Sequence, residues 1–493
     1  MKRSLFILLV VLSACASQKD NAKPEGNAVA DAGTSKLQEA AELGRIAADY
    51  PPRANQCPPP TRRSDTVFEN FGQKTPDAYA WLEDEKSPEV QQWMLAQDKC
   101  ARNVLAHLPN RDVLAKRFKQ LYYVDSVSPP IKRGTRYFYV RTHADKEKPI
   151  VYWREGEKGQ EKVLLDPNKW SAEGTISLGE WVPSWDGKKV AFTQRPNAAD
   201  EATLYVLDVD TNKQSDVDVI EGAKYASPDW LPDNSGFYYE FLPTDPKIPV
   251  AERPGYTELR LHKLGVDPKT DAVIHEKTGD PSTFLEGSLS RDGKYLFVYV
   301  IRGWSENDVY LQRVGKQKDF TLLVKGKDAQ YGVEAWKDNF YIVTDEGAPK
   351  QHVFKVSAAK PERKNWKEIV KEDKDATLDG VNIVGGQLSL SYLKDASSEL
   401  RLASLDGKPE RTVALPLAIG TSSNLIGNED EDEAFYSFSS FTLPKQVYRT
   451  SIAKGGAELW AKVELPIDPT PYTVTLVRYP SKDGTQIPMF LIH

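Results

Sequence analysis

The sequence predicts a mainly β protein built around a seven-bladed β-propeller. Short runs rich in aromatic and β-branched residues recur seven times, and their starts lie about 44 to 59 residues apart, the period of a propeller blade. Most runs are followed by a second strand-like run within the reach of a hairpin, and several follow a turn of Asp, Asn and Gly. A pair of β-sandwiches is the alternative, but one period shared by seven runs favours the propeller. The seven runs are residues 136–140, 189–193, 236–240, 295–300, 339–344, 387–392 and 434–439.

Composition fits this fold and excludes some partners. The 493 residues include 22 Tyr, 17 Phe and 11 Trp, an aromatic content that suits strands. The formal net charge is −6, with both signs mixed along the chain, which argues against a nucleic-acid partner. Beyond the N-terminus, no apolar run reaches the roughly 18 residues that a membrane-spanning helix needs.

The N-terminus has the pattern of a bacterial lipoprotein signal peptide. Lys2 and Arg3 precede the apolar stretch 5–12, and residues 12–15 read Leu-Ser-Ala-Cys, like a lipobox. We therefore expect lipidation of Cys15 and anchoring to a membrane of the bacterial cell envelope, facing the periplasm or exterior. In the alternative, an ordinary secretory signal, Cys15 is incidental.

Two amphipathic helices are predicted between the N-terminal tether and the propeller. The sequence Ser-Pro-Glu at 87–89 suits a helix start, and Pro109 with Asn110 separates this helix from the next. Their apolar faces need a partner domain to cover them. The predicted apolar positions are Val90, Trp93, Met94, Ala101, Val104, Leu105 and Leu108 on the first helix and Val113, Leu114, Phe118 and Leu121 on the second.

Two cysteines follow Cys15. An oxidising envelope compartment permits a disulfide between Cys57 and Cys100. The position of Cys100 on a helix favours a small buried apolar residue instead, and the sequence leaves both interpretations open.

The C-terminal stretch predicts a hairpin. Residues 472–479 alternate in polarity, residues 481–484 form a turn, and residues 486–493 return as a second strand. The chain stops inside that strand, so we expect a chain cut short of a complete domain.

Several motifs resemble the prolyl oligopeptidase family of serine peptidases, in the family's order, from about residue 62 onward. Pro-Asp-Ala-Tyr-Ala-Trp-Leu-Glu-Asp at 76–84 looks like a signature near the start of these enzymes, although Ala78 replaces the usual Pro. Residues 134–139 are similar to the family's first blade, and residues 165–168 with 173–175 to the segment that leads into the second. Residues 479–490 resemble the hairpin that opens the catalytic domain.

The resemblance implies a two-domain peptidase in which a propeller caps an α/β-hydrolase domain and filters access to it. Ser, Asp and His of that domain cleave short peptides after proline, and the N-terminal helices pack against it. The expected fold is therefore a seven-bladed propeller with an N-terminal helical segment and the opening hairpin of an incomplete α/β-hydrolase domain. The expected partners are short proline-containing peptides and a missing or separate hydrolase domain. The alternative is a non-catalytic propeller lipoprotein that binds peptides or a protein partner.

No catalytic residue, cofactor site or metal site is predicted within this chain, so we expect it to be inactive alone. The nucleophile elbow Gly-x-Ser-x-Gly is absent, and residues 420–424 lack its second glycine. Residues 208–212 begin like a calcium loop but predict a hairpin turn, because Lys213 and Val219 occupy the required Gly and Glu positions. The acidic run 429–433 is interpreted as a solvated turn before the last blade. The histidines expected at the surface or in propeller loops are His107, His143, His262, His275, His352 and His493.

The predicted domains are the signal peptide at 1–14, a flexible tether at 15–52, the helical segment at 53–130, the propeller at 131–455, and a linker with the first hairpin of a truncated α/β-hydrolase domain at 456–493.

Overall fold

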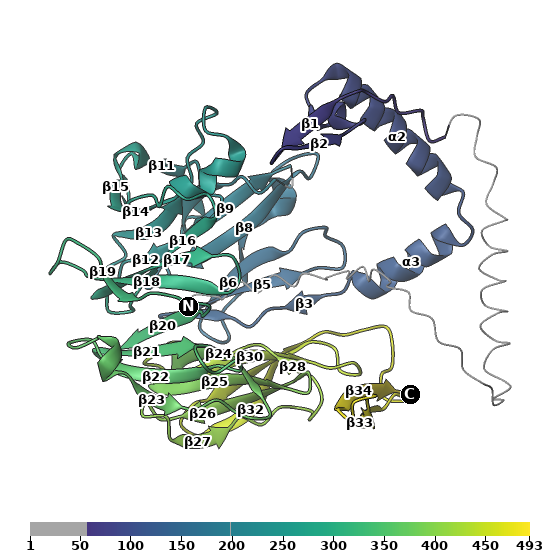
Figure 1. Ribbon diagram of the computed structural model, residues 1–493. Coiled ribbons are helices and arrows are strands. Elements are labelled where there is room, and N and C mark those ends of the chain that lie inside the picture. Colours follow the sequence, from purple (N-terminus) through teal and green to yellow (C-terminus); the bar gives the residue numbers. More distant parts are fainter. Residues whose placement is uncertain (1–56, 198) are drawn as a thin grey trace. The chain divides into compact units, whose positions relative to one another are not determined.

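A computed structural model describes residues 57–197 and 199–493 (Figure 1). The chain divides into two compact units, residues 1–122 and 123–493, and each is described by itself. The predicted signal peptide, Cys15 and the tether lie outside the described residues.

The described part of the first unit consists of a hairpin and two α-helices. Its elements are β1 (Val67–Asn70), β2 (Gln73–Pro76), the 3-10 helix η1 (Ala80–Glu83), α2 (Pro88–Ala106) and α3 (Arg111–Tyr122). Pro88 occupies the first turn of α2 as expected, but Ser87 makes no side-chain capping bond. Glu89 instead forms a two-pronged ion pair with Arg62. Most of the predicted apolar stripe is exposed, including Met94, Leu105 and Phe118.

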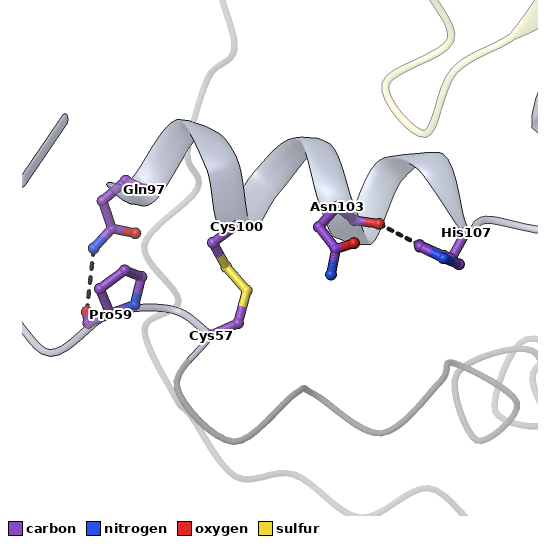
Figure 2. The surroundings of a disulfide bond; sticks show 6 residues. All are labelled: Cys57, Pro59, Gln97, Cys100, Asn103 and His107. Carbon is purple, nitrogen blue, oxygen red and sulfur yellow. Dashed lines mark hydrogen bonds between the residues drawn. A yellow bond between two sulfur atoms is a disulfide. The ribbon is translucent and has the colours of Figure 1, made fainter. Parts of the chain in front are cut away.

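A disulfide joins Cys57 to Cys100, with 5.6 Å between the Cα atoms (Figure 2). The expectation of a buried apolar Cys100 was therefore wrong. The disulfide holds the segment 57–62 along α2, where Gln97 Nε2 donates a hydrogen bond to the Pro59 carbonyl at 3.2 Å. Two tryptophans donate hydrogen bonds to the same segment: Trp93 Nε1 to the Thr61 hydroxyl and Trp81 Nε1 to the Arg62 carbonyl. Both indole rings are half-buried.

We predict that breaking this disulfide destabilises the helical unit. The bond closes a separation of 43 residues, so its loss from Cys57→Ser/Cys100→Ser should cost about 2–4 kcal/mol of unfolding free energy. Thermal unfolding followed by circular dichroism at the helical band measures this, because both described α-helices lie in this unit. A reductant should lower the midpoint of the parent chain and leave the double variant unchanged. Equal midpoints for the parent with and without reductant would contradict the prediction.

The second unit contains, in its described residues, seven antiparallel sheets of four or five consecutive strands and one two-stranded sheet. Blade 1 has β3 (Ser126–Val127), β4 (Ile131–Arg133), β5 (Arg136–Thr142), β6 (Ile150–Glu155) and β7 (Lys162–Leu165), and blade 2 has β8 (Ile176–Pro183), β9 (Lys189–Pro196), β10 (Thr203–Asp208) and β11 (Lys213–Ile220). Blade 3 has β12 (Asp229–Trp230), β13 (Gly236–Phe241), β14 (Glu258–Lys263) and β15 (Ala272–His275), and blade 4 has β16 (Thr283–Leu289), β17 (Tyr295–Arg302), β18 (Glu306–Arg313) and β19 (Thr321–Val324). Blade 5 has β20 (Tyr331–Trp336), β21 (Asn339–Thr344), β22 (His352–Ser357) and β23 (Lys367–Val370), and blade 6 has β24 (Thr377–Val384), β25 (Gln387–Lys394), β26 (Ser397–Ala403) and β27 (Pro409–Thr412). Blade 7 has β28 (Thr421–Ser422), β29 (Ile426–Gly427), β30 (Glu433–Ser439), β31 (Gln446–Ser451) and β32 (Gly455–Lys462). Short 3-10 helices lie between strands at η2 (Pro167–Lys169), η3 (Val250–Tyr256), η4 (Pro268–Thr270) and η5 (Arg363–Asn365).

These sheets confirm the predicted seven-bladed propeller. Each of the seven apolar runs forms the second strand of one blade: β5, β9, β13, β17, β21, β25 and β30. The propeller starts at Ser126 and continues to Lys462, beyond the expected limits of 131 and 455. The expected final hairpin is present as β33 (Val474–Pro480) and β34 (Gln486–Ile492).

The core lies between neighbouring blades. Phe297 of blade 4 meets Phe340 of blade 5 edge to face, with ring centroids 5.1 Å apart, and both side chains are buried. Each blade thus covers the apolar face of the next one. The fit is tight at the first strands: a Cβ atom on Gly287 would lie 2.5 Å from Leu259 Cδ1 of blade 3, so this position has no room for a side chain.

The ring closes through side chains, because no strand is shared between blades 1 and 7. Arg133 Nη1 donates to Asn428 Oδ1 at 3.0 Å, and Lys132 Nζ lies 2.8 Å from Glu431 and 3.2 Å from Glu433. The acidic run 429–433 forms a turn as expected, with Asp430 and Asp432 exposed, but the turn lies inside blade 7 and not before it. It joins β29 to β30, and two of its carboxylates pair with blade 1.

A buried histidine ties blade 2 to blade 3. His262 of β14 is fully buried, with Nε2 2.9 Å from Asp218 of β11 and Nδ1 3.0 Å from Asp271. The Gly265 amide also donates to Asp218, and the Tyr239 hydroxyl donates to Asp271. Burial acts to lower the pKa of His262, but the hydrogen bonds to the two carboxylates outweigh it and raise this pKa to about 9.

We predict that this cluster makes stability fall at alkaline pH. The pKa of His262 is about 9 in the folded chain and about 6.5 in the unfolded chain. Protonated His262 therefore adds its full contribution to the unfolding free energy below pH 6.5, and this contribution is lost as the pH rises through 9. Urea unfolding between pH 7 and 10 should show a slope of at most about 1.4 kcal/mol per pH unit from this group. His262→Gln should remove that slope, and His107→Gln, a change at the helix end, should keep it. A parent chain without the slope would contradict the pairing.

Candidate functional site

The strand directions give the propeller two different ends. An antiparallel blade with four strand positions returns the chain to the end where it started. The chain therefore enters before β3 and leaves after β32 at one end, which we call the linker end. At the opposite end, which we call the turn end, the first strand of each blade turns into the second.

Exposed aromatic side chains gather at the linker end. Within the described blades they are Phe284 at the start of β16, Trp304 between β17 and β18, and Phe441 between β30 and β31. Trp304 is 81% exposed and Phe441 is 62% exposed, values unusual for such large side chains. The turns at the opposite end are instead rich in Asp, Asn, Gly and Lys, as in residues 185–188 and 291–294. The linker end thus has the character of a surface that another structure covers.

The C-terminal hairpin contacts the same end. Phe490 of β34 packs against Phe441, with ring centroids 5.6 Å apart, and Arg478 of β33 pairs with Asp395 in the β25–β26 turn. Met489 and Leu491 remain more than two-fifths exposed. The hairpin therefore extends the apolar surface of the linker end.

The first strands line the centre of the ring and carry mainly acidic side chains. The fourth strands are the exposed outer strands of the blades, as the mostly exposed β11 and β32 show. Among the described first-strand residues, Lys132 and Arg133 are the basic ones. The acidic ones are Glu180, Asp229, Glu286, Glu334 and Asp379. The charged residues of the first strands are thus mainly acidic.

The structure does not assemble a catalytic triad from the described residues. In residues 420–424, Thr421 and Ser422 form β28, and the Ser423 hydroxyl donates to the Asn424 carbonyl. This segment is therefore part of a strand and not a nucleophile elbow. Among the described residues, no serine hydroxyl is hydrogen-bonded to a histidine ring.

Four of the six histidines lie near the surface or in connections, and two do not. His262 and His352 are buried in strands, against the expectation, because each finds carboxylate partners: Asp218 and Asp271 for His262 and Glu368 for His352. His352 Nδ1 lies 2.8 Å from Glu368 of the adjacent strand. A single histidine in the sequence has no neighbouring pattern that distinguishes a buried position from an exposed one.

Metal ligands and membrane spans are likewise not found where the structure is described. No group of His, Cys, Asp and Glu there could hold a metal ion, and no helix there is long and apolar enough to cross a bilayer. Residues 208–212 form the expected hairpin turn, with Asp208 bonded to Lys189 and Thr211.

The fold defines the class: a seven-bladed propeller module with an N-terminal helical segment. Residues 59–463 match the family model described as "Prolyl oligopeptidase, N-terminal beta-propeller domain". The chain belongs to the prolyl oligopeptidase family and is the propeller portion of such a protein, which confirms the resemblance of its motifs.

Known relatives share the fold, and the chain matches only part of their length. A prolyl endopeptidase of Elizabethkingia miricola is 28% identical over 435 residues, which are 88% of this chain and 61% of that enzyme. A structure from an analysis of two prolyl endopeptidases is 63% identical, with a TM-score of 0.84 over 88% of this chain and 64% of that one. Prolyl oligopeptidase B of Galerina marginata, bound to a 35mer substrate, shares the fold with a TM-score of 0.77 at 23% identity. The chain thus spans about three fifths of the length of the curated relatives it matches.

Proposed function

We propose that this chain is the substrate-gating part of a lipid-anchored serine peptidase that hydrolyses short peptides after proline. The Ser, Asp and His of an α/β-hydrolase domain outside these residues would perform the reaction. Family membership supports this proposal, as do relatives named prolyl endopeptidase.

The observation that carries the proposal is the apolar surface at the linker end. Trp304, Phe441 and the hairpin residues Met489, Leu491 and Ile492 are exposed. At about 25 cal/mol per Å² of apolar area, leaving several such side chains in water costs several kcal/mol. A hydrolase domain that covers the linker end would recover this free energy.

We predict that the linker-end aromatic residues hold that domain. Trp304→Gln/Phe441→Gln should reduce self-association and apolar-dye binding of the chain alone with little change in its melting temperature, because both side chains are mostly exposed and Phe441 loses only its contact with Phe490. In the full-length protein, the same changes should weaken the contact between the two domains and make the linker more sensitive to limited proteolysis. Val266→Gln, an exposed apolar residue at the turn end, is the matched control. Equal behaviour of both variants would refute a docking role.

The activity test compares the full-length gene product from its own cells with the chain 1–493. The full-length protein should cleave a Gly-Pro reporter and lose activity with a serine-directed inhibitor, whereas the chain alone should be inactive. A monomeric chain that cleaves the reporter would overturn the proposal, and so would an inactive full-length protein.

The same preparation tests the anchor. We propose acylation of Cys15, which rests on the Leu-Ser-Ala-Cys pattern at 12–15. The activity should sediment with membranes, and Cys15→Ser should move it to the supernatant. If the activity is divided between membranes and supernatant in the same way in both proteins, Cys15 is not the anchor and the segment is an ordinary secretory signal.

A further inference from the structure

The indole ring of Trp185 contacts two arginine side chains at the turn end. The guanidinium carbon of Arg133 lies 4.2 Å from the centroid of the indole ring, and that of Arg291 lies 3.8 Å from it. At these distances both guanidinium groups interact with the π-system of the indole, and cation–π attraction stabilises the contact.

The three side chains come from blades that are not neighbours. Arg133 ends β4 of blade 1, Trp185 lies in the β8–β9 turn of blade 2, and Arg291 lies in the β16–β17 turn of blade 4. In a ring of seven, blades 1 and 4 face each other across the centre, with two blades between them on the shorter side. A single ring that touches both arginines therefore links blades 1 and 4 at the turn end.

Hydrogen bonds to two further blades fix this stack. Trp185 Nε1 donates to the Trp230 carbonyl of blade 3 at 3.1 Å, and Trp230 Nε1 donates back to the Val182 carbonyl at 3.0 Å. Arg133 is 4% exposed and donates to Asn428 of blade 7. Burial lowers the pKa of Arg133 to about 10, so this side chain keeps its charge at neutral pH.

We propose that the Arg133–Trp185–Arg291 stack is a plug that closes the propeller axis at the turn end. The space between the first strands is then a chamber open only at the linker end. This inference rests on the proposed function for its consequence: the plug sets how long a peptide tail the chamber accepts. Strands β8 and β24 have 8 residues and β16 has 7, which at about 3.3 Å per residue gives a depth of about 25 Å. A fully extended peptide tail with about as many residues as these strands therefore reaches the plug.

The test uses the full-length protein and peptides with one proline and progressively longer tails. The readout is kcat/KM for each peptide divided by kcat/KM for the Gly-Pro reporter. In the parent and in Trp185→Phe, which keeps an aromatic ring, this ratio should fall once the tail exceeds the chamber. In Trp185→Ala and Arg291→Gln the fall should move to longer tails. The same length profile in all four proteins would overturn the plug.

A second measurement separates failure of the plug from failure of the proposed function. If the full-length protein does not cleave the reporter, the proposed function is wrong and the stack is tested in the chain alone. With 5-fluorotryptophan incorporated, the ¹⁹F resonance that disappears in Trp185→Phe belongs to Trp185. That resonance should shift in Arg133→Gln and in Arg291→Gln, and stay in place in Arg363→Gln, which contacts Trp366 instead. No shift in either of the first two variants would refute the stack.

Discussion

The closure of the ring is the constraint on which this propeller depends, because no strand passes from blade 7 to blade 1. The ion pairs at this seam are partly exposed, with Lys132 at 26% and Glu431 at 33%, and such pairs contribute little on their own. Tyr137 adds more, since it is buried against Phe435 and lies 5.6 Å from the ring of Trp460. The seam is thus held mainly by aromatic burial, and the ion pairs of Lys132 add little to it.

The second strands were predictable from the sequence because each is covered on both faces by the neighbouring blades. β17 and β21 each bury three consecutive residues and therefore read as continuous apolar runs. The first strands left no comparable pattern. β12 and β28 have two residues each, and Gly287 in β16 is required by the close approach of Leu259. The fourth strands vary: β27 is polar and mostly exposed, whereas β19 is mainly apolar.

The contacts that the sequence did not predict join residues far apart along the chain. Cys57 is bonded to Cys100, and His262 pairs with Asp218, because the fold brings separate elements together. The spacing of these residues along the sequence does not predict either contact. One signal was available for the axial stack. Trp185-Asp-Gly and Arg291-Asp-Gly are equivalent turns of two blades, and equivalent turns lie at the same end of a propeller. This places both side chains at one end before any contact is known.

The difference between the two ends follows from the even number of strand positions in each blade. Chain that precedes or follows the propeller must attach at the linker end, so apolar side chains such as Trp304 are useful there and would be a liability elsewhere. The turn end carries no such connection. Its short polar turns come close to the axis, and a long side chain from one turn can cross to another blade, as Trp185 does between Arg133 and Arg291. An open apolar end and a closed polar end are thus two results of one topology.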